Sequence, residues 1–296
     1  MKKGKALSAL LLCYLIWGLQ PLYWDLLENF SPMFVLCTRI VMSMFFTWLY
    51  LICSGRLREI FDTLRNWSVM KYLLPASLFL CCDWAIFIWA VASGHLLDAT
   101  LGYYLNPLVI FLVGVFVFRE KGDALEYTAV GLACVGIAIS TISYGSFPAL
   151  ALLFTLFWPV YATIKKAVNA DPIVSVAIEA ALMTPFAIVY ALIFCRGDGG
   201  LASVTWSLSP LLLCSGVITA LPMILYTYVV NDLPFKVVGI LQYAGTSINF
   251  LCGILFMHET LSSSKLIMFV FIWLGLIIFT LGSFRKQRHQ KTESKQ

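Results

Sequence analysis

The sequence predicts an all-α integral membrane protein, with ten transmembrane helices in two inverted five-helix repeats. Three observations predict this fold class: the composition, the number of long apolar runs, and a match between the two halves of the chain. Hydrophobic residues make up 61% of the 296 residues and charged residues 12%, against about 45–50% and about 25% in soluble domains. A soluble protein of this size could not bury so much apolar surface. The same composition excludes a disordered chain, a coiled coil and a disulfide-rich secreted domain.

Ten apolar runs come close to the length of about 20 residues that a helix needs to cross a bilayer. They are Leu7–Leu27, Pro32–Ser54, Tyr72–His95, Leu96–Phe118, Ala124–Ser143, Phe147–Ile164, Pro172–Cys195, Trp206–Val230, Pro234–Met257 and Leu261–Phe284. Inside lipid every backbone polar group must be paired, and the runs lack the alternation of barrel strands, so we expect helices. Between the second and third runs, residues 55–67 are typical of a short amphipathic helix on the inner membrane surface.

The positions of Lys and Arg predict the orientation of the spans. With the N-terminus in the cytoplasm, 17 of the 20 basic residues fall on inner segments, Arg196 and Lys265 fall on outer segments, and Arg39 lies inside a span. The inner ones are Lys2, Lys3, Lys5, Arg56, Arg58, Arg65, Lys71, Arg119, Lys121, Lys165, Lys166, Lys236, Arg285, Lys286, Arg288, Lys291 and Lys295. Both termini are therefore expected in the cytoplasm. Because these charges are spread over six short segments, the net charge of +5 does not indicate nucleic-acid binding.

The two halves of the chain match when the second is aligned with the first. Ser31-Pro32 then falls on Asp171-Pro172, Arg39 on Glu179, Tyr104 on Tyr243, Gly136 on Gly275, and the segment 114–120 on 253–259; Trp17 falls near Trp158. The expected division is a first repeat at 6–143, a second at 147–284 and a basic cytoplasmic tail at 285–296. Since five spans are an odd number, the second repeat crosses the membrane in the opposite sense, as in many secondary transporters.

Three ionisable residues lie well inside predicted spans: Arg39, Asp83 and Glu179. Each costs at least about 2.5–3.5 kcal/mol at the centre of a spanning helix, so such groups pair with each other or face a wet cavity. Two roles stay open, a structural ion pair and a contact with substrate or gate. The depth of each residue along its helix, at about 1.5 Å per residue, predicts an Arg39–Asp83 pair on the outer side. Glu179 is expected to lie alone on the inner side, as a gate or a proton-coupling group. Asp83 is a second candidate for proton coupling.

Polar and aromatic residues near mid-span add candidates for substrate binding. The predicted substrate-binding residues are Arg39, Asp83, Trp84, Tyr103, Asn106, Gln242, Tyr243 and Asn249. For any single aromatic among them, helix packing or an interfacial belt is the alternative. In the fifth and tenth spans the small residues Gly131, Ala133, Gly136 and Gly275 suit close helix contact or a homodimer interface.

The chain has none of the nucleotide-binding, zinc-protease or serine-hydrolase motifs GxxxxGK[ST], HExxH and GxSxG. The nine cysteines have no metal-binding spacing and are expected to act as small buried hydrophobes. We therefore expect no cofactor, no metal and no enzymatic activity. Two other classes stay open, a membrane enzyme acting on a lipid headgroup and a membrane scaffold without transport activity.

Several motifs resemble one known family. They are Tyr14-Leu-Ile-Trp-Gly18, Thr38-Arg39, Asp83-Trp84, Phe87-Ile-Trp-Ala-Val91, Leu101-Gly-Tyr-Tyr-Leu-Asn-Pro-Leu108 and Gln242-Tyr243. Together they are similar to RarD permeases, in the EamA family of the drug/metabolite transporter superfamily. The resemblance implies a secondary active transporter or exporter of a small organic solute, an amino-acid-like metabolite or drug, that works by alternating access in the bacterial inner membrane. Asp83 stands where that family commonly has Asn, so the resemblance implies no proton-accepting role for it.

Overall fold

The computed structural model describes residues 3–92, 96–144, 149–256 and 263–293. These residues form eleven α-helices and one short 3-10 turn, η1. In chain order they are α1 (Lys3–Asp25), α2 (Pro32–Cys53), α3 (Leu57–Arg65), α4 (Trp67–Ala92), α5 (Leu96–Phe116), α6 (Ala124–Tyr144), α7 (Ala149–Ala167), α8 (Pro172–Phe194), η1 (Leu201–Ser203), α9 (Ser209–Val230), α10 (Phe235–Leu255) and α11 (Ser263–Glu293). Each predicted apolar run carries one long helix, and α3 lies within the predicted amphipathic stretch.

Several helices are long and apolar enough to cross a membrane. Within the described residues seven satisfy this criterion: α1, α2, α4, α6, α8, α9 and α10. α5 and α11 contribute shorter apolar stretches, Gly102–Phe116 and Leu266–Gly282. The chain is therefore a multi-pass, all-helical membrane protein.

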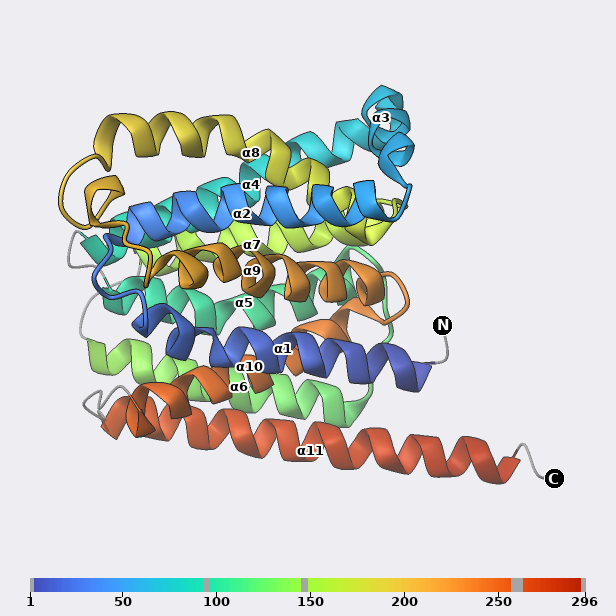
Figure 1. Ribbon diagram of the computed structural model, residues 1–296. Helices are drawn as coiled ribbons and strands as arrows, with labels where there is room; N and C mark the ends of the chain where they lie inside the picture. The colour runs from blue at the N-terminus through green and yellow to red at the C-terminus, as the bar shows by residue number, and fades with distance from the viewer. Residues whose placement is uncertain (1–2, 93–95, 145–148, 257–262, 294–296) are drawn as a thin grey trace.

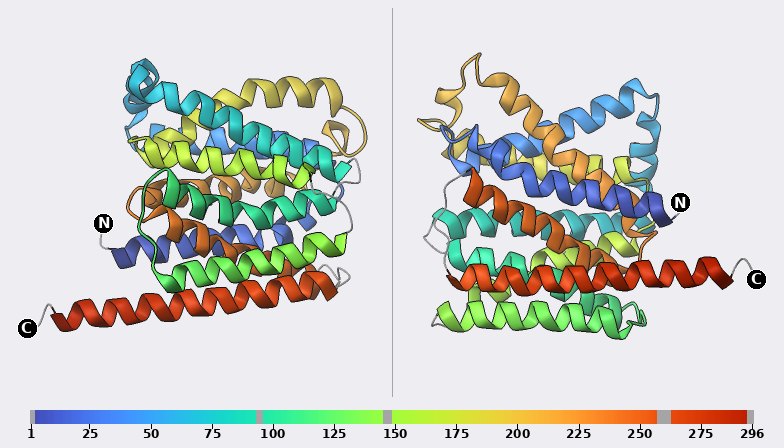
Figure 2. Two further views of the ribbon diagram at one scale, coloured as in Figure 1. Left: turned by 180° about the vertical axis from the view of Figure 1, so that it is seen from behind. Right: turned by 90° about the horizontal axis from the view of Figure 1, so that it is seen from below.

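The long helices lie side by side in one bundle, with α6 and α11 together at one edge (Figures 1 and 2). α1 packs against α9 and α10, and α7 packs against α4 and α5. α2 packs against α8 and α9, and α5 packs against α10. Both termini and α3 lie at the same end of the bundle (Figure 1). This end is called the terminal end below.

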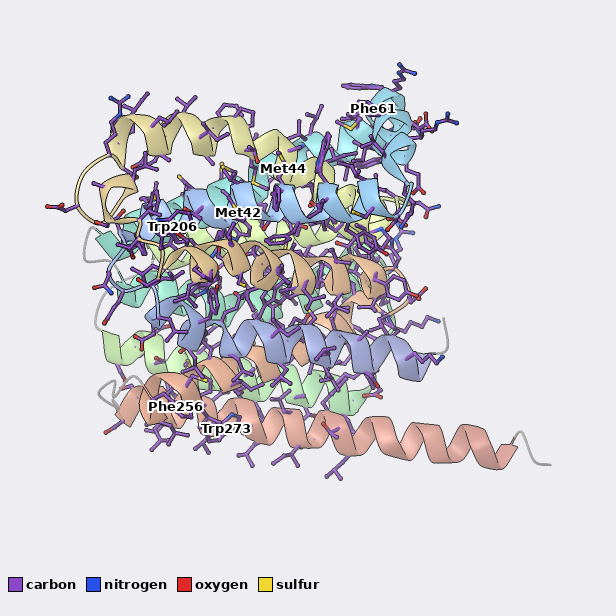
Figure 3. All side chains as sticks on the ribbon, in the orientation of Figure 1. Met42, Met44, Phe61, Trp206, Phe256 and Trp273 are labelled. Carbon is purple, nitrogen blue, oxygen red and sulfur yellow. The ribbon has the colours of Figure 1, made fainter. Side chains whose placement is uncertain are left out.

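Exposed aromatic side chains mark the two ends of the bundle. Phe61 on α3 is 48% exposed at the terminal end, and Trp206 and Phe256 are 96% and 62% exposed at the opposite end (Figure 3). Trp favours the interface between lipid and water. The position of Trp206 at one end therefore suits a bundle whose long axis crosses the bilayer.

Two helices begin with the same local structure. Ser31 precedes Pro32 and its Oγ accepts a hydrogen bond from the Phe34 amide at 3.3 Å. Asp171 precedes Pro172, and its Oδ1 accepts hydrogen bonds from the amides of Ile173 and Val174 at 3.0 and 3.1 Å. A proline at the first helical position needs no hydrogen bond, and the capping oxygen satisfies the amides that follow. These caps fix where α2 and α8 enter the bundle.

Ion pairs hold the terminal end together. Arg56 donates to Glu59 at 2.6 Å and to Asp171 at 2.8 Å, so it joins the start of α3 to the start of α8. The hydrogen bond from Arg56 holds the pKa of the Glu59 carboxyl below its usual range. Lys236 at the start of α10 donates to Glu126 of α6 at 2.6 Å. These contacts connect the two predicted repeats at this end.

Glu120, just beyond α5, caps the start of α10. Its Oε1 accepts from the Phe235 amide at 2.6 Å, and its Oε2 accepts from the Lys236 amide at 2.9 Å. Gly114 lies so close to this turn that an added Cβ would come within 2.6 Å of the Lys236 nitrogen. The pattern from glycine to glutamate occurs at 114–120 and again at 253–259. In the first copy, its two end residues therefore have a structural role at the start of α10. The second copy ends in residues outside the described ones.

α11 continues beyond the predicted span, which ends at Phe284, through the predicted tail to Glu293. The tail contains no Pro or Gly and has many good helix formers. The structure differs from the sequence prediction at two places. Lys165 and Lys236, predicted to lie on inner segments, are buried, with 0% and 7% exposure. Cys53, Cys134 and Cys214 are exposed rather than buried, since lipid receives a small apolar side chain as well as a protein core does.

The glycines of α6 and α11 make a close contact within this chain. An added Cβ on Gly275 would lie 2.7 Å from the Ala129 carbonyl oxygen, and one on Gly136 would lie 2.9 Å from the Met268 carbonyl oxygen. Around Gly131 nothing lies within 4 Å. Of the two roles predicted for these small residues, close helix contact is therefore confirmed for Gly136 and Gly275.

Replacing Gly275 by Leu is expected to separate α6 from α11, because backbone atoms cannot move aside for the new side chain. We expect a loss of about 1–3 kcal/mol, the usual cost of overpacking, measured as a lower melting temperature in detergent. Gly131→Leu is the matched control and should leave the melting temperature nearly unchanged. Equal effects of the two variants would contradict this description of the α6–α11 contact.

Candidate functional site

A narrow cavity lies at the centre of the bundle, between α2, α4, α8 and α9. Its water-accessible volume is about 20 Å³, which is room for about one water molecule. Its walls are mainly apolar, and the lining residues include Ser43, Trp84, Glu179 and Thr219. The cavity thus has one buried charged residue and one aromatic residue among mainly apolar neighbours.

The Arg39 guanidinium stacks on the ring of Trp84, which lines this cavity, and lies near a second indole ring, that of Trp24. Its Cζ is 4.0 Å from the centre of the Trp84 ring and 5.4 Å from that of Trp24. Such stacking stabilises a cation and fixes the plane of the guanidinium. The carboxylate of Asp83 and the hydroxyl of Tyr103 interact electrostatically with Arg39, and Tyr103 also hydrogen-bonds Asp83.

One hydrogen-bond donor of Arg39 is left over. Its Nε is buried and has no hydrogen-bond partner among the described residues. A buried donor without a partner costs free energy, and it marks a position where an acceptor from a ligand or water fits. The Nε–H of Arg39 can therefore donate to one additional acceptor.

A second charged cluster surrounds Glu179 on α8. Glu179 Oε1 accepts from Lys165 Nζ at 2.8 Å, and its Oε2 accepts from the Tyr161 hydroxyl at 3.2 Å. Lys165 also donates to the hydroxyl of Ser175. Lys165 and Glu179 are 0% and 1% exposed. The prediction that Glu179 stands alone is therefore wrong: it forms a fully buried ion pair.

This pair was missed because Lys165 lies near the end of an apolar run, where a basic residue suggests a loop. Spacing is the signal that could have found it. Tyr161 and Lys165 are four residues apart on α7, and Ser175 and Glu179 are four apart on α8. Residues at this spacing share a helix face, so the two short sets can meet across a tight α7–α8 connection.

Aromatic rings cover the side of the Glu179 cluster. Trp158 contacts Trp17 edge-on at 5.2 Å, and both rings contact Tyr226, at 5.6 and 5.8 Å. Tyr226 Oη and Trp158 Nε1 are buried without a hydrogen-bond partner among the described residues. Rings of this kind form rigid walls with a few polar atoms to spare, which is typical of ligand cavities.

The predicted substrate-binding residues separate into two groups. Arg39 interacts with Asp83, Trp84 and Tyr103, and Trp84 lines the cavity. Asn106, Gln242, Tyr243 and Asn249 lie on α5 and α10, and none of them lines it.

The residues of the second group have different surroundings. The Tyr243 hydroxyl donates to the Tyr104 carbonyl at 3.2 Å, which pairs α10 with α5. Asn249 is exposed. Asn106 and Gln242 keep a buried side-chain oxygen without a partner among the described residues. The side chains of the Phe87–Val91 motif lie outside the described ones.

Metal binding has no support in the described part of the chain, where no three His, Cys, Asp or Glu side chains are placed to hold an ion. The site is instead a small cavity lined by the buried Glu179 and by Trp84, on which Arg39 stacks. Opposite charges in and next to one cavity suit recognition of a small polar solute.

Comparison with known proteins shows the family to which the chain belongs. The EamA-like transporter family matches residues 4–142. An uncharacterized transporter, YojE of Bacillus subtilis, is 35% identical over 98% of this chain and 98% of its own length. The chain belongs to the EamA-like transporter family. Protein RarD of Escherichia coli is 30% identical over 94% of each chain.

The fold of this EamA-family chain also agrees with a solved structure. A crystal structure with 17% sequence identity superposes with a TM-score of 0.73, covering 94% of this chain and 98% of that one. The family and its relatives are named as transporters. The alternative of a lipid-headgroup enzyme therefore loses its support.

Proposed function

We propose that this EamA-family protein is a secondary active transporter or exporter of a small organic solute, which it moves by alternating access through the central cavity. One observation carries the proposal: Glu179 lines the cavity between α2, α4, α8 and α9 together with Trp84, and the oppositely charged Arg39 stacks on that Trp84 ring. An amino-acid-like metabolite or drug with both an acidic and a basic group would match these charges. The Arg39 fork suits its carboxylate, and Glu179 and Asp83 are the proposed gate or proton-coupling groups.

The proposed transport cycle includes a change of cavity size. A volume of about 20 Å³ admits no solute larger than water. A solute can therefore enter only when helices lining the cavity have moved. Substrate contacts of Asn106, Gln242, Tyr243 and Asn249, on the α5–α10 side, would have to form in such a wider state.

Two inverted repeats, 6–143 and 147–284, followed by a tail at 285–296, are part of the proposal. The close contacts of α6 and α11 support it. In the alignment of the two halves, Gly136 corresponds to Gly275, and Ala129 corresponds to Met268. The contact of Gly136 with Met268 therefore has its counterpart in the contact of Gly275 with Ala129. Likewise, α1 packs against α9 and α10 as α7 packs against α4 and α5. Both sets of contacts are those expected from a two-fold relation between the halves.

The proposed location is the bacterial inner membrane, with all ten long helices spanning it and both termini in the cytoplasm. The outward face of α6 and α11, where Gly131 meets open space, is the surface proposed for a homodimer. The common end of the two termini (Figure 1) supports an even number of spans.

Reporter fusions test this orientation. Alkaline phosphatase fused after Phe284 is expected to be inactive, and green fluorescent protein at the same place is expected to fluoresce. Fusions in the segment 196–205, between α8 and α9, are the matched control and should behave in the opposite way. An active phosphatase after Phe284 would contradict the ten-span topology.

The function itself is tested with purified protein in liposomes. Uptake and efflux of labelled amino acids, their esters and their N-acetyl derivatives would be followed with and without a proton gradient. We expect gradient-driven accumulation of at least one solute, with a lower apparent affinity in Arg39→Lys. Equal fluxes in protein-free liposomes for every solute would contradict the proposed transport.

A further inference from the structure

The buried Lys165–Glu179 pair has a geometry that a simple helix contact does not need. Along antiparallel α7 and α8, Lys165 lies between two acceptors, Glu179 at 2.8 Å and Ser175. Tyr161 bonds the second oxygen of Glu179 and also hydrogen-bonds Thr227 of α9. Lys165 thus has a second acceptor within reach when it leaves Glu179.

Of these residues, only Glu179 lines the central cavity. Thr219, on the α9 wall of the same cavity, is 5% exposed, and its Oγ1 has no partner among the described residues. Glu179 and Thr219 thus line the same small cavity, and each carries side-chain oxygen. Both accept hydrogen bonds, which is what an ammonium group with three donors requires.

We propose that Glu179 and Thr219 bind a protonated primary amine, and that Lys165 forms its ion pair with the Glu179 carboxylate when no amine is bound. The inference rests on the proposed function only in assigning the amine to a transported solute. A primary ammonium has the same charge and donors as the Lys165 side chain, so it can take the same place. Lys165 prevents the carboxylate from being left unpaired in the interior, which would be costly.

A consequence follows for the position of Arg39. In the alignment of the two halves Arg39 corresponds to Glu179. Arg39 stacks on Trp24, which the same alignment places next to Lys165. One half therefore offers a cation and the other an anion at equivalent places. With the amine at Glu179, the carboxylate of the same solute would be directed toward Arg39.

Because Lys165 competes with the amine, its removal is expected to strengthen amine binding. The experiment is the melting temperature of the purified protein in ethylammonium chloride, with sodium chloride and tetramethylammonium chloride as controls that cannot donate hydrogen bonds. Ethylammonium should raise the melting temperature of Lys165→Met by about 2–4 °C, the shift expected at a few-fold excess over the dissociation constant. The wild type should respond less.

Two variants control this result. Lys71→Met removes an exposed lysine and should respond like the wild type. The double variant Lys165→Met with Glu179→Gln should not respond to ethylammonium. Equal effects of ethylammonium and sodium on Lys165→Met, or a response that persists in the double variant, would overturn the proposal.

A second measurement keeps the proposal testable if Lys165→Met does not fold. Ser43→Cys, in a cysteine-free background, places a thiol on the cavity wall, and its modification by methyl methanethiosulfonate is timed. Ethylammonium, but not tetramethylammonium, should slow the reaction, and Thr219→Val should weaken this protection. A thiol that does not react, or equal protection by both cations, would overturn the proposal. Because neither measurement uses transport, an amine response without any transported solute would count only against the proposed function.

Discussion

Lys165→Met is expected to destabilise the protein by about 3–5 kcal/mol, the cost of leaving one partner of a buried ion pair without its counter-charge. Glu179 would keep only the Tyr161 hydroxyl, at 3.2 Å, from its present partners. The double variant Lys165→Met with Glu179→Gln removes both charges and should recover most of the stability. Transport by the double variant should stay lost, because the cavity no longer holds an anion.

The measurement is the melting temperature in detergent, followed by solute uptake in liposomes for every variant that folds. Lys71→Met is the matched control, since Lys71 is exposed and lies over the ring of Tyr72 at 5.1 Å. It should cost less than about 1 kcal/mol. If Lys165→Met were as stable as Lys71→Met, the buried pair would not have the energetic role assigned to it.

Arg39→Lys is expected to preserve folding and to reduce the apparent affinity for a carboxylate-bearing solute about 10-fold to 100-fold. Lysine keeps the charge that interacts with Asp83, but it loses the planar fork and the stacking on Trp84. A hydrogen bond to a charged group contributes about 1.5–3 kcal/mol, and about 1.4 kcal/mol corresponds to a factor of ten. The measurement is the concentration dependence of uptake.

Arg39→Met is the more severe change, because it strands Asp83, which is 6% exposed. Combined with Asp83→Asn it should fold again but not transport. Arg58→Lys, at an exposed position on α3, is the control and should leave the affinity unchanged. Normal affinity in Arg39→Lys would contradict a substrate contact at this arginine.

The fold could be predicted from the sequence because one physical rule determines it. In lipid an apolar run of about 20 residues has almost no alternative to a helix, so each predicted run carries a long helix. Helix ends were less predictable where no proline or glycine marks them. α2 and α8 begin at Pro32 and Pro172 as predicted, whereas α11 continues past Phe284.

The site could be predicted only in part. Charged residues are rare in spans, and this rarity indicated Arg39, Asp83 and Glu179 as site candidates. The stacking of Arg39 on Trp84 agrees with this interpretation for Arg39. The burial of Lys165 was not predicted. A basic residue at a helix end usually indicates membrane topology, and the inward direction of this side chain depends on tertiary packing. The position of the cavity depends on how α4 and α9 cross, which no local pattern in the sequence specifies.

Labelling of cavity residues tests most directly whether solute passes between α2, α4, α8 and α9. Thr219→Cys and Met223→Cys, on the cavity wall, would be exposed to a water-soluble maleimide in a cysteine-free background, with and without the transported solute. Trp206→Cys, at a position that is 96% exposed at the end of the bundle, is the control. We predict that both cavity thiols react and that solute protects them, whereas the thiol at position 206 reacts and is never protected. Unreactive cavity thiols in a protein that transports, or protection at Asn249→Cys alone, would contradict a path through this cavity.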